Sequence, residues 1–268
     1  MLVKDPETAA ELIRGNSNQI VQEMNEFTGK TFRTRGGRMG SGMGLLLEGL
    51  WGYTTNHLIN SSGIEISWIA EDHYNDYAVT SLEHDWDPVT RLGELLRIEA
   101  KTMNLGADET KGHFAELTHK IDPNDLLLVL LWRWTPVGGS TRVVAPQVVD
   151  VFLDRAQPLA EMRDALHVAR GGWFVQAGEC PDDCLPENCT HVGEPLNAKG
   201  KRERLTGPES TRPSNKVSYA NNFGGLKRML SSRGGEAAGI KRDFYESDAV
   251  YRKYIDFMDV RRLDLTLD

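Results

Sequence analysis

The stretch that decides the fold is Leu95-Leu96-Arg97-Ile98-Glu99-Ala100-Lys101, an apolar run that delivers a carboxylate and, two residues later, a lysine. Side chains at positions i and i+2 of a β-strand project from the same face. We therefore expect Glu99 and Lys101 to lie side by side on one face of a sheet. A carboxylate beside an ammonium group can hold a divalent cation and orient or deprotonate the water next to it, which suits phosphodiester hydrolysis.

The same spacing occurs a second time, at Glu109-Thr110-Lys111, so the tripeptide alone is not decisive. The context separates the two copies. Glu99 ends a β-prone run, whereas Glu109 lies in a glycine- and aspartate-containing stretch, residues 106–112, with no strand before it.

The residues upstream of the first copy add a second carboxylate. Asp76 leads directly into the β-prone segment 77–80, and the turn-forming stretch 83–93 predicts a hairpin that joins this segment to the 95–101 strand. An aspartate that opens one strand and a Glu-x-Lys that closes the next resemble the PD-(D/E)xK nuclease superfamily, to which most type II restriction endonucleases belong. The matching positions are Asp76, Glu99 and Lys101, over a resemblance that spans about residues 44–134.

The first acid of this pattern has two candidates. Asn75 stands before Asp76, where the family has proline, whereas Asp87 has a proline on its C-terminal side, Pro88. We favour Asp76 because an alternating apolar run follows it directly, and only a loop-like stretch follows Asp87.

The resemblance implies a Mg²⁺-dependent endonuclease that cuts double-stranded DNA at a specific sequence and acts as a homodimer. Asp76, Glu99 and the carbonyl group of Ala100 would bind Mg²⁺, and Lys101 would position or activate the water. Many restriction enzymes also carry a glutamate on their first core helix. Glu48 has that place within the helix predicted over residues 44–59; the alternative is that Glu48 simply faces solvent.

Three cysteines and a histidine fall within twelve residues and form a second candidate site, Cys180-x3-Cys184-x4-Cys189-x-His191. They satisfy the ligand set of a structural Cys₃His zinc site that has no open position for catalysis. A disulfide with one free thiol, or three unpaired surface cysteines, are the alternatives.

Charge is distributed unevenly along the chain. The formal net charge is −8, but residues 199–242 hold eleven Lys or Arg against three acidic residues, so this segment carries +8 and the remainder −16. Local basic density decides whether a phosphate backbone can be engaged, so this segment and the stretch Arg33–Arg38 are candidates for DNA contact, or else solvated loops. No run is long enough to span a membrane and no signal segment opens the chain, so we expect a cytoplasmic protein.

Apolar periodicity predicts an α/β fold with a mixed central sheet flanked by helices, a restriction-endonuclease-like core with a zinc-binding loop inserted in it. The expected domains are a nuclease core over 1–178, a zinc-knuckle and basic DNA-contacting insertion over 179–216, and C-terminal helices over 217–268 that pack on the core. Helices are predicted over residues 7–26, 44–59, 110–121, 159–170, 219–229 and 248–258, and strands over 64–70, 77–80, 95–101, 125–134, 147–153 and 172–176.

The alternatives to a restriction enzyme are a repair or recombination nuclease of the same superfamily, and a zinc-stabilised nucleic-acid-binding or protein-interaction module without activity. In the second of these, Glu99 and Lys101 would form an ordinary surface pair.

Overall fold

The structure is a computed structural model that describes residues 2–35, 42–69, 75–106, 112–176, 191–197, 223–227, 229 and 235–264, without the side chains of Ser140 and 259–264. The residues group into two compact units. The first comprises Met1–Gly112, Asp122–Gln157 and Lys253–Asp268, and the second His113–Ile121 and Pro158–Arg252. Both boundaries of the expected 179–216 insertion lie outside the described residues.

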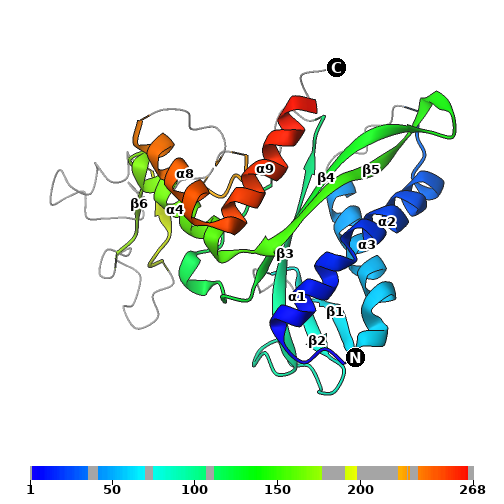
Figure 1. Cartoon of the computed structure of the whole chain (residues 1–268), viewed down its shortest axis with the longest axis horizontal. Coiled ribbons are helices and arrows are strands. Elements are labelled where there is room, and N and C mark those ends of the chain that lie inside the picture. Colours follow the sequence, from blue (N-terminus) through cyan, green and yellow to red (C-terminus); the bar gives the residue numbers. More distant parts are fainter. Residues whose placement is uncertain are drawn as a thin grey trace. The chain divides into compact units, whose positions relative to one another are not determined.

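The first unit is built on a five-stranded sheet with the order β1-β2-β3-β4-β5 (Figure 1). Its strands are β1 (Ile64–Trp68), β2 (Tyr77–Ser81), β3 (Glu94–Asn104), β4 (Leu126–Val137) and β5 (Ser140–Arg155). β3 and β4 are parallel, and every other neighbouring pair is antiparallel. The prediction of an α/β fold with a mixed central sheet is therefore confirmed.

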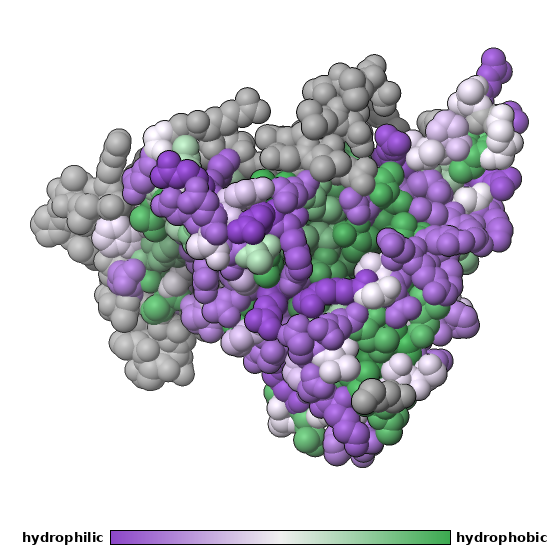
Figure 2. All heavy atoms as spheres, in the orientation of Figure 1, coloured by the Kyte–Doolittle hydropathy of each residue, from purple (hydrophilic) through white to green (hydrophobic). Residues whose placement is uncertain are grey.

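Helices α1 (Pro6–Gly15), α2 (Ser17–Thr31) and α3 (Gly42–Ile59) pack on one face of this sheet. Their buried side chains form one core with alternate residues of the strands, such as Leu96 and Ile98 of β3. Figure 2 shows hydrophilic residues over the outer sides of α1 and α2, as expected for amphipathic helices.

The prediction of a single helix over residues 7–26 was wrong, because the helix is interrupted at Asn16. The amide group of its side chain donates to the carbonyl oxygen of Leu12 (2.8 Å), so Asn16 caps α1 and a new helix starts at Ser17.

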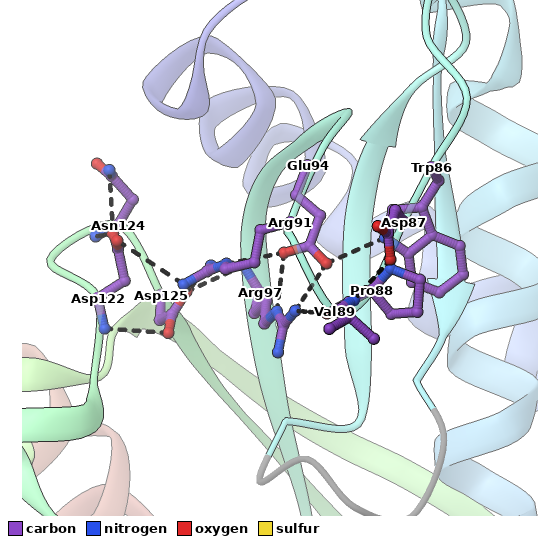
Figure 3. Close-up of polar contacts among 10 residues, drawn as sticks. All are labelled: Trp86, Asp87, Pro88, Val89, Arg91, Glu94, Arg97, Asp122, Asn124 and Asp125. Carbon is purple, nitrogen blue, oxygen red and sulfur yellow. Dashed lines mark hydrogen bonds and ion pairs between the residues drawn. The ribbon is translucent and has the colours of Figure 1, made fainter.

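A buried polar network joins the β2–β3 loop to the connection that precedes β4 (Figure 3). The carboxylate of Glu94 accepts hydrogen bonds from Arg91, Arg97 and the Trp86 indole at 2.8–3.0 Å. Asp125, whose side chain is fully buried, accepts the backbone N–H of Arg97 (3.1 Å). Burial tends to raise the pKa of Glu94, but these donors more than offset it and the pKa is lowered. The network holds the loop end of β3 in place.

The second unit contains α4 (Gln157–Ala169, from Pro158 onward), a two-stranded sheet of β6 (Trp173–Phe174) and β7 (Pro195–Leu196), and α8 (Gly235–Ser247). The strand expected at 172–176 is thus shorter than predicted and pairs with β7 rather than joining the central sheet. Helix α8 was not predicted. Helix α9 (Ala249–Asp264) begins in this unit and ends in the first, where Tyr254 packs edge-on against Phe152 of β5 at 5.3 Å.

The helices predicted over 110–121 and 219–229 are absent from the described residues 113–121 and 223–227 of the second unit. The described parts of 110–121 and 219–229 pair with each other: Phe114 N–H donates to the carbonyl oxygen of Gly224 (2.7 Å), and His113 bridges Gly225. A Cβ atom at Gly224 would lie 2.8 Å from the backbone of Phe114, so only glycine permits this approach. Residues 112–121 contain only a 3₁₀ turn, Thr118–Lys120, and 223–227 form turns.

Candidate active site

The candidate site lies where β2 ends and leaves the edge of β3 open. β2 pairs with β3 as far as Tyr77 and Ile98, and Asp76 directly precedes that last pair. Beyond it, the Asp76 carboxylate takes the place of a strand partner: its Oδ2 accepts the backbone N–H of Ala100 at 2.7 Å. A residue 24 positions away in the sequence is thereby fixed beside the Glu99-Ala100-Lys101 segment.

Lys101 is paired with both carboxylates. Its Nζ lies 2.5 Å from Oε1 of Glu99 and 3.7 Å from Oδ2 of Asp76. Glu99 is buried, with 7% of the residue exposed, so this is no solvated surface pair. Burial lowers the pKa of Lys101, but the charges of Glu99 and Asp76 outweigh that effect and raise it. The ammonium group therefore stays protonated at neutral pH, which favours orienting a water over deprotonating it.

The strand itself differs from the prediction in one respect. β3 runs to Asn104 and pairs with β4 along this length, with Lys101 opposite Val129. Glu99 and Lys101 thus lie inside a strand supported on one side by β4, which gives both side chains a rigid base.

Glu48 enters the same site from α3. Gly44, Glu48 and Gly52 are four residues apart, so they form one stripe along the helix. A Cβ atom at Gly44 would lie 2.5 Å from Oγ1 of Thr102, and one at Gly52 would lie 2.8 Å from the Tyr77 ring. The two glycines let α3 approach the sheet closely, and the Tyr77 hydroxyl donates to the backbone carbonyl of Glu48 at 2.6 Å.

The environment of Glu48 shifts the pKa of its carboxyl group strongly. Burial raises its pKa from 4.5 to about 7, and the negative charge of Asp76 adds to this effect. The Lys101 ammonium and hydrogen bonds from Thr102 act in the opposite direction and are weaker. Glu48 is half-buried, so its side chain does not simply face solvent. A carboxyl group whose pKa lies near 7 and is affected by the charges of two neighbouring site residues is typical of functional sites.

Asp87 has a different role in the structure. In the turn between β2 and β3, its carboxylate accepts the backbone N–H of Val89 (2.9 Å) and the Thr90 hydroxyl (2.7 Å). The Thr90 hydrogen bond lowers the pKa of Asp87. The ion pairs of Lys101 are with Asp76 and Glu99, so the structure brings Asp76 rather than Asp87 to the lysine.

The donor set of the site suits a hard divalent cation. Asp76, Glu99 and the carbonyl group of Ala100 offer oxygen atoms, the ligands that Mg²⁺ prefers. Beside them, the Asn75 amide is buried (3% exposed) and has no hydrogen-bond partner in the described part of the chain, a costly arrangement that a bound group would relieve. Among the described residues no three His, Cys, Asp or Glu side chains converge on one metal position, so the fit rests on two carboxylates and a carbonyl group.

Of the candidate zinc ligands, Cys180, Cys184 and Cys189 lie outside the described residues. His191 is described: its Nδ1 is buried and has no hydrogen-bond partner within the described ranges. A buried ring nitrogen of this kind is compatible with metal ligation.

Sequence reasoning did not assign Thr102 or Asn75 to the candidate site. Thr102 follows the motif directly, and the signal that could have revealed it is the Gly-x3-Glu-x3-Gly spacing of α3, which predicts a close helix–sheet contact around Glu48.

No family model, no curated protein and no solved structure matches this chain. The described helices include none long and apolar enough to cross a membrane.

Proposed function

We propose that this chain is a Mg²⁺-dependent endonuclease that hydrolyses phosphodiester bonds of double-stranded DNA at a specific sequence, as a type II restriction enzyme does. The observation that carries the proposal is the convergence of Asp76, Glu99 and Lys101 at the open edge of β3. It matches the arrangement that the PD-(D/E)xK resemblance implies, with the Glu48 carboxyl group next to it.

In this proposal Asp76, Glu99 and the Ala100 carbonyl would hold Mg²⁺, which when bound supplies Lewis acidity and lowers the pKa of a coordinated water. Lys101, held by the two carboxylates, orients the attacking water and offsets negative charge that develops on the phosphate. Glu48, with a pKa of about 7, is suited to exchange a proton with water near neutral pH.

The experiment is cleavage of supercoiled plasmid DNA by the purified protein in Mg²⁺ and in EDTA. We expect the protein to give linear or nicked product in Mg²⁺ and no product in EDTA. Asp76→Ala should be inactive and Asp87→Ala should retain activity, because the first residue contacts the site and the second holds a turn. Equal activity of the two variants would remove Asp76 from the site. Discrete ends mapped on a phage DNA of known sequence would distinguish a restriction enzyme from a repair or recombination nuclease.

Zinc is a separate part of the proposal. Cys180, Cys184, Cys189 and His191 would hold one structural Zn²⁺, supported by their spacing and by the buried Nδ1 of His191. Metal binding would add folding free energy in a segment too short to build its own core.

We also propose a homodimer, because an enzyme that cuts both strands of a symmetric site most simply uses two active sites related by a two-fold axis. The aromatic residues of α9 do not support it: Tyr251 and Tyr254 are buried within the chain, so they offer no surface to a second copy. Light scattering at micromolar concentration decides the matter, since a mass near the 30.0 kDa of one chain contradicts the dimer and about twice that mass supports it.

A further inference from the structure

Two segments far apart in the sequence share an unusual composition. Residues 27–47 contain Lys30, Arg33, Arg35 and Arg38 and no acidic residue, and residues 126–149 contain Arg133 and Arg142 and no acidic residue. These six positive charges stand out in a chain whose net charge is −8.

The structure brings the two segments together. Thr34 and Val144 exchange both backbone hydrogen bonds, at 2.9 Å each, so the chain just after α2 is joined to β5 by an isolated β-bridge. The guanidinium group of Arg33 reaches the hairpin turn, where a Cβ atom on Gly138 would lie 3.9 Å from its Nη1. We call residues 33–35 together with 133–144 the basic ribbon.

The hairpin of the basic ribbon is tightly built. Gly138 and Gly139 both have positive φ, 66° and 72°, so a two-residue turn joins β4 to β5. Arg33, Arg35, Arg133 and Arg142 are all exposed. Within the described residues, Arg35 and Arg133 have no carboxylate partner, so their charge is available to a ligand.

The position of the basic ribbon relates it to the candidate active site, since both belong to the first unit. β4 runs parallel to β3 and continues beyond Asn104, the last residue of β3, which pairs with Trp132 (Figure 1). Val129 is the strand partner of Lys101, and Arg133 lies four residues farther along β4. The Cα atoms of Val129 and Arg133 are therefore at most ~13 Å apart. The hairpin turn is at most ~30 Å from Val129. These spans correspond to about four and about nine base pairs of a duplex, which rises ~3.4 Å per base pair along its axis.

We propose that the basic ribbon is a binding surface for the phosphate backbone of duplex DNA, which it holds along the line from the hairpin turn to Lys101. This inference rests on the proposed function for its ligand and adds the surface that grips that ligand. Exposed arginines such as Arg35 and Arg133 can neutralise phosphates and release counterions, and a two-stranded hairpin is narrow enough to follow a groove.

The test is equilibrium binding of a fluorescent duplex of about 20 base pairs, in EDTA so that no cleavage occurs, at several salt concentrations. The double variant Arg35→Gln/Arg133→Gln should bind about tenfold or more weakly. Loss of two phosphate contacts should make the slope of log K against log salt concentration shallower by about 1.8. The double variant Arg35→Lys/Arg133→Lys should keep the wild-type slope.

The matched control is Lys4→Gln/Arg155→Gln, which removes the same charge from exposed residues of the first unit that are paired with Glu83 and Glu7. It should leave the slope unchanged. Equal effects of the two glutamine double variants, or a wild-type protein that does not bind the duplex, would overturn the inference. Circular dichroism and the melting temperature confirm that each variant is folded.

The outcome also separates this inference from the proposed function. Binding through the basic ribbon without Mg²⁺-dependent cleavage of plasmid DNA would leave the inference standing and contradict the nuclease. Mg²⁺-dependent cleavage with binding that is insensitive to Arg35 and Arg133 would contradict the ribbon alone.

Discussion

Replacing Glu48 by glutamine is expected to stabilise the protein above neutral pH and to leave its stability almost unchanged near pH 4.5. Burial raises the pKa of Glu48 from 4.5 to about 7. In the unfolded chain the same carboxyl group ionises near 4.5. Between these values the unfolded chain releases a proton that the folded protein keeps, so ionisation favours unfolding. Glu48 therefore lowers the stability progressively as the pH rises from about 4.5 to about 7, and the full penalty persists above that range.

The size of the effect follows from the pKa difference. At about 1.4 kcal/mol per pH unit, a rise from 4.5 to about 7 corresponds to about 3 kcal/mol. Part of the side chain is accessible to water, which screens the penalty, so we expect Glu48→Gln to stabilise the protein by roughly 1–3 kcal/mol at pH 8.5.

The assay is urea unfolding of wild type and Glu48→Gln at pH values from about 4.5 to about 8.5, with the difference in free energy of unfolding plotted against pH. Glu11→Gln, on an exposed position of α1, is the control and should give a flat difference near zero. If Glu48→Gln is no more stable than wild type at pH 8.5, or if its effect does not depend on pH, the burial argument is wrong.

Three other changes test the packing and the metal. Gly52→Ala should cost about 1–3 kcal/mol because its Cβ would lie 2.8 Å from the Tyr77 ring, whereas Gly49→Ala on the same helix has nothing within 4 Å and should be neutral or stabilising in thermal melts. Glu94→Ala should cost about 3–5 kcal/mol by urea unfolding, since it removes a carboxylate that pairs with the buried Arg97, and a loss below 1 kcal/mol would contradict that role. Metal analysis of protein purified without added zinc should find about one zinc per chain, and Cys184→Ser should lose the metal and lower the melting temperature; metal-free protein of wild-type stability would remove the site.

The sequence predicted the central sheet and α3 well because each of these elements carries its own signal. The unbroken apolar run of β4 and the Glu-x-Lys end of the 95–101 run mark strands that are buried on one or both faces. The two helix predictions that failed, over residues 110–121 and 219–229, share a different cause. The conformation of Phe114 and of Gly224 is decided by their pairing with each other, and no local pattern reports a partner about 110 residues away.

The same distinction holds at the candidate site. Asp76, Glu99 and Lys101 could be grouped from the sequence because strand periodicity and a hairpin connection relate them. The pairing of Thr34 with Val144 could not be predicted, because a single β-bridge between an irregular segment and a strand produces no repeating pattern of apolar residues in the sequence. The perturbed pKa of Glu48 was likewise out of reach, since it depends on how closely two glycines let α3 approach the sheet.

The most direct test of the central claim compares Lys101→Ala with Lys111→Ala, which removes the lysine of the second Glu-x-Lys copy, in Mg²⁺-dependent cleavage of plasmid DNA. Lys101→Ala should lower the cleavage rate at least about a hundredfold while duplex affinity in EDTA stays within about threefold, because the ammonium group acts on the transition state. Lys111→Ala should cut at the wild-type rate. Wild-type cleavage by Lys101→Ala, or equal losses in both variants, would contradict the assignment of Lys101 to the active site.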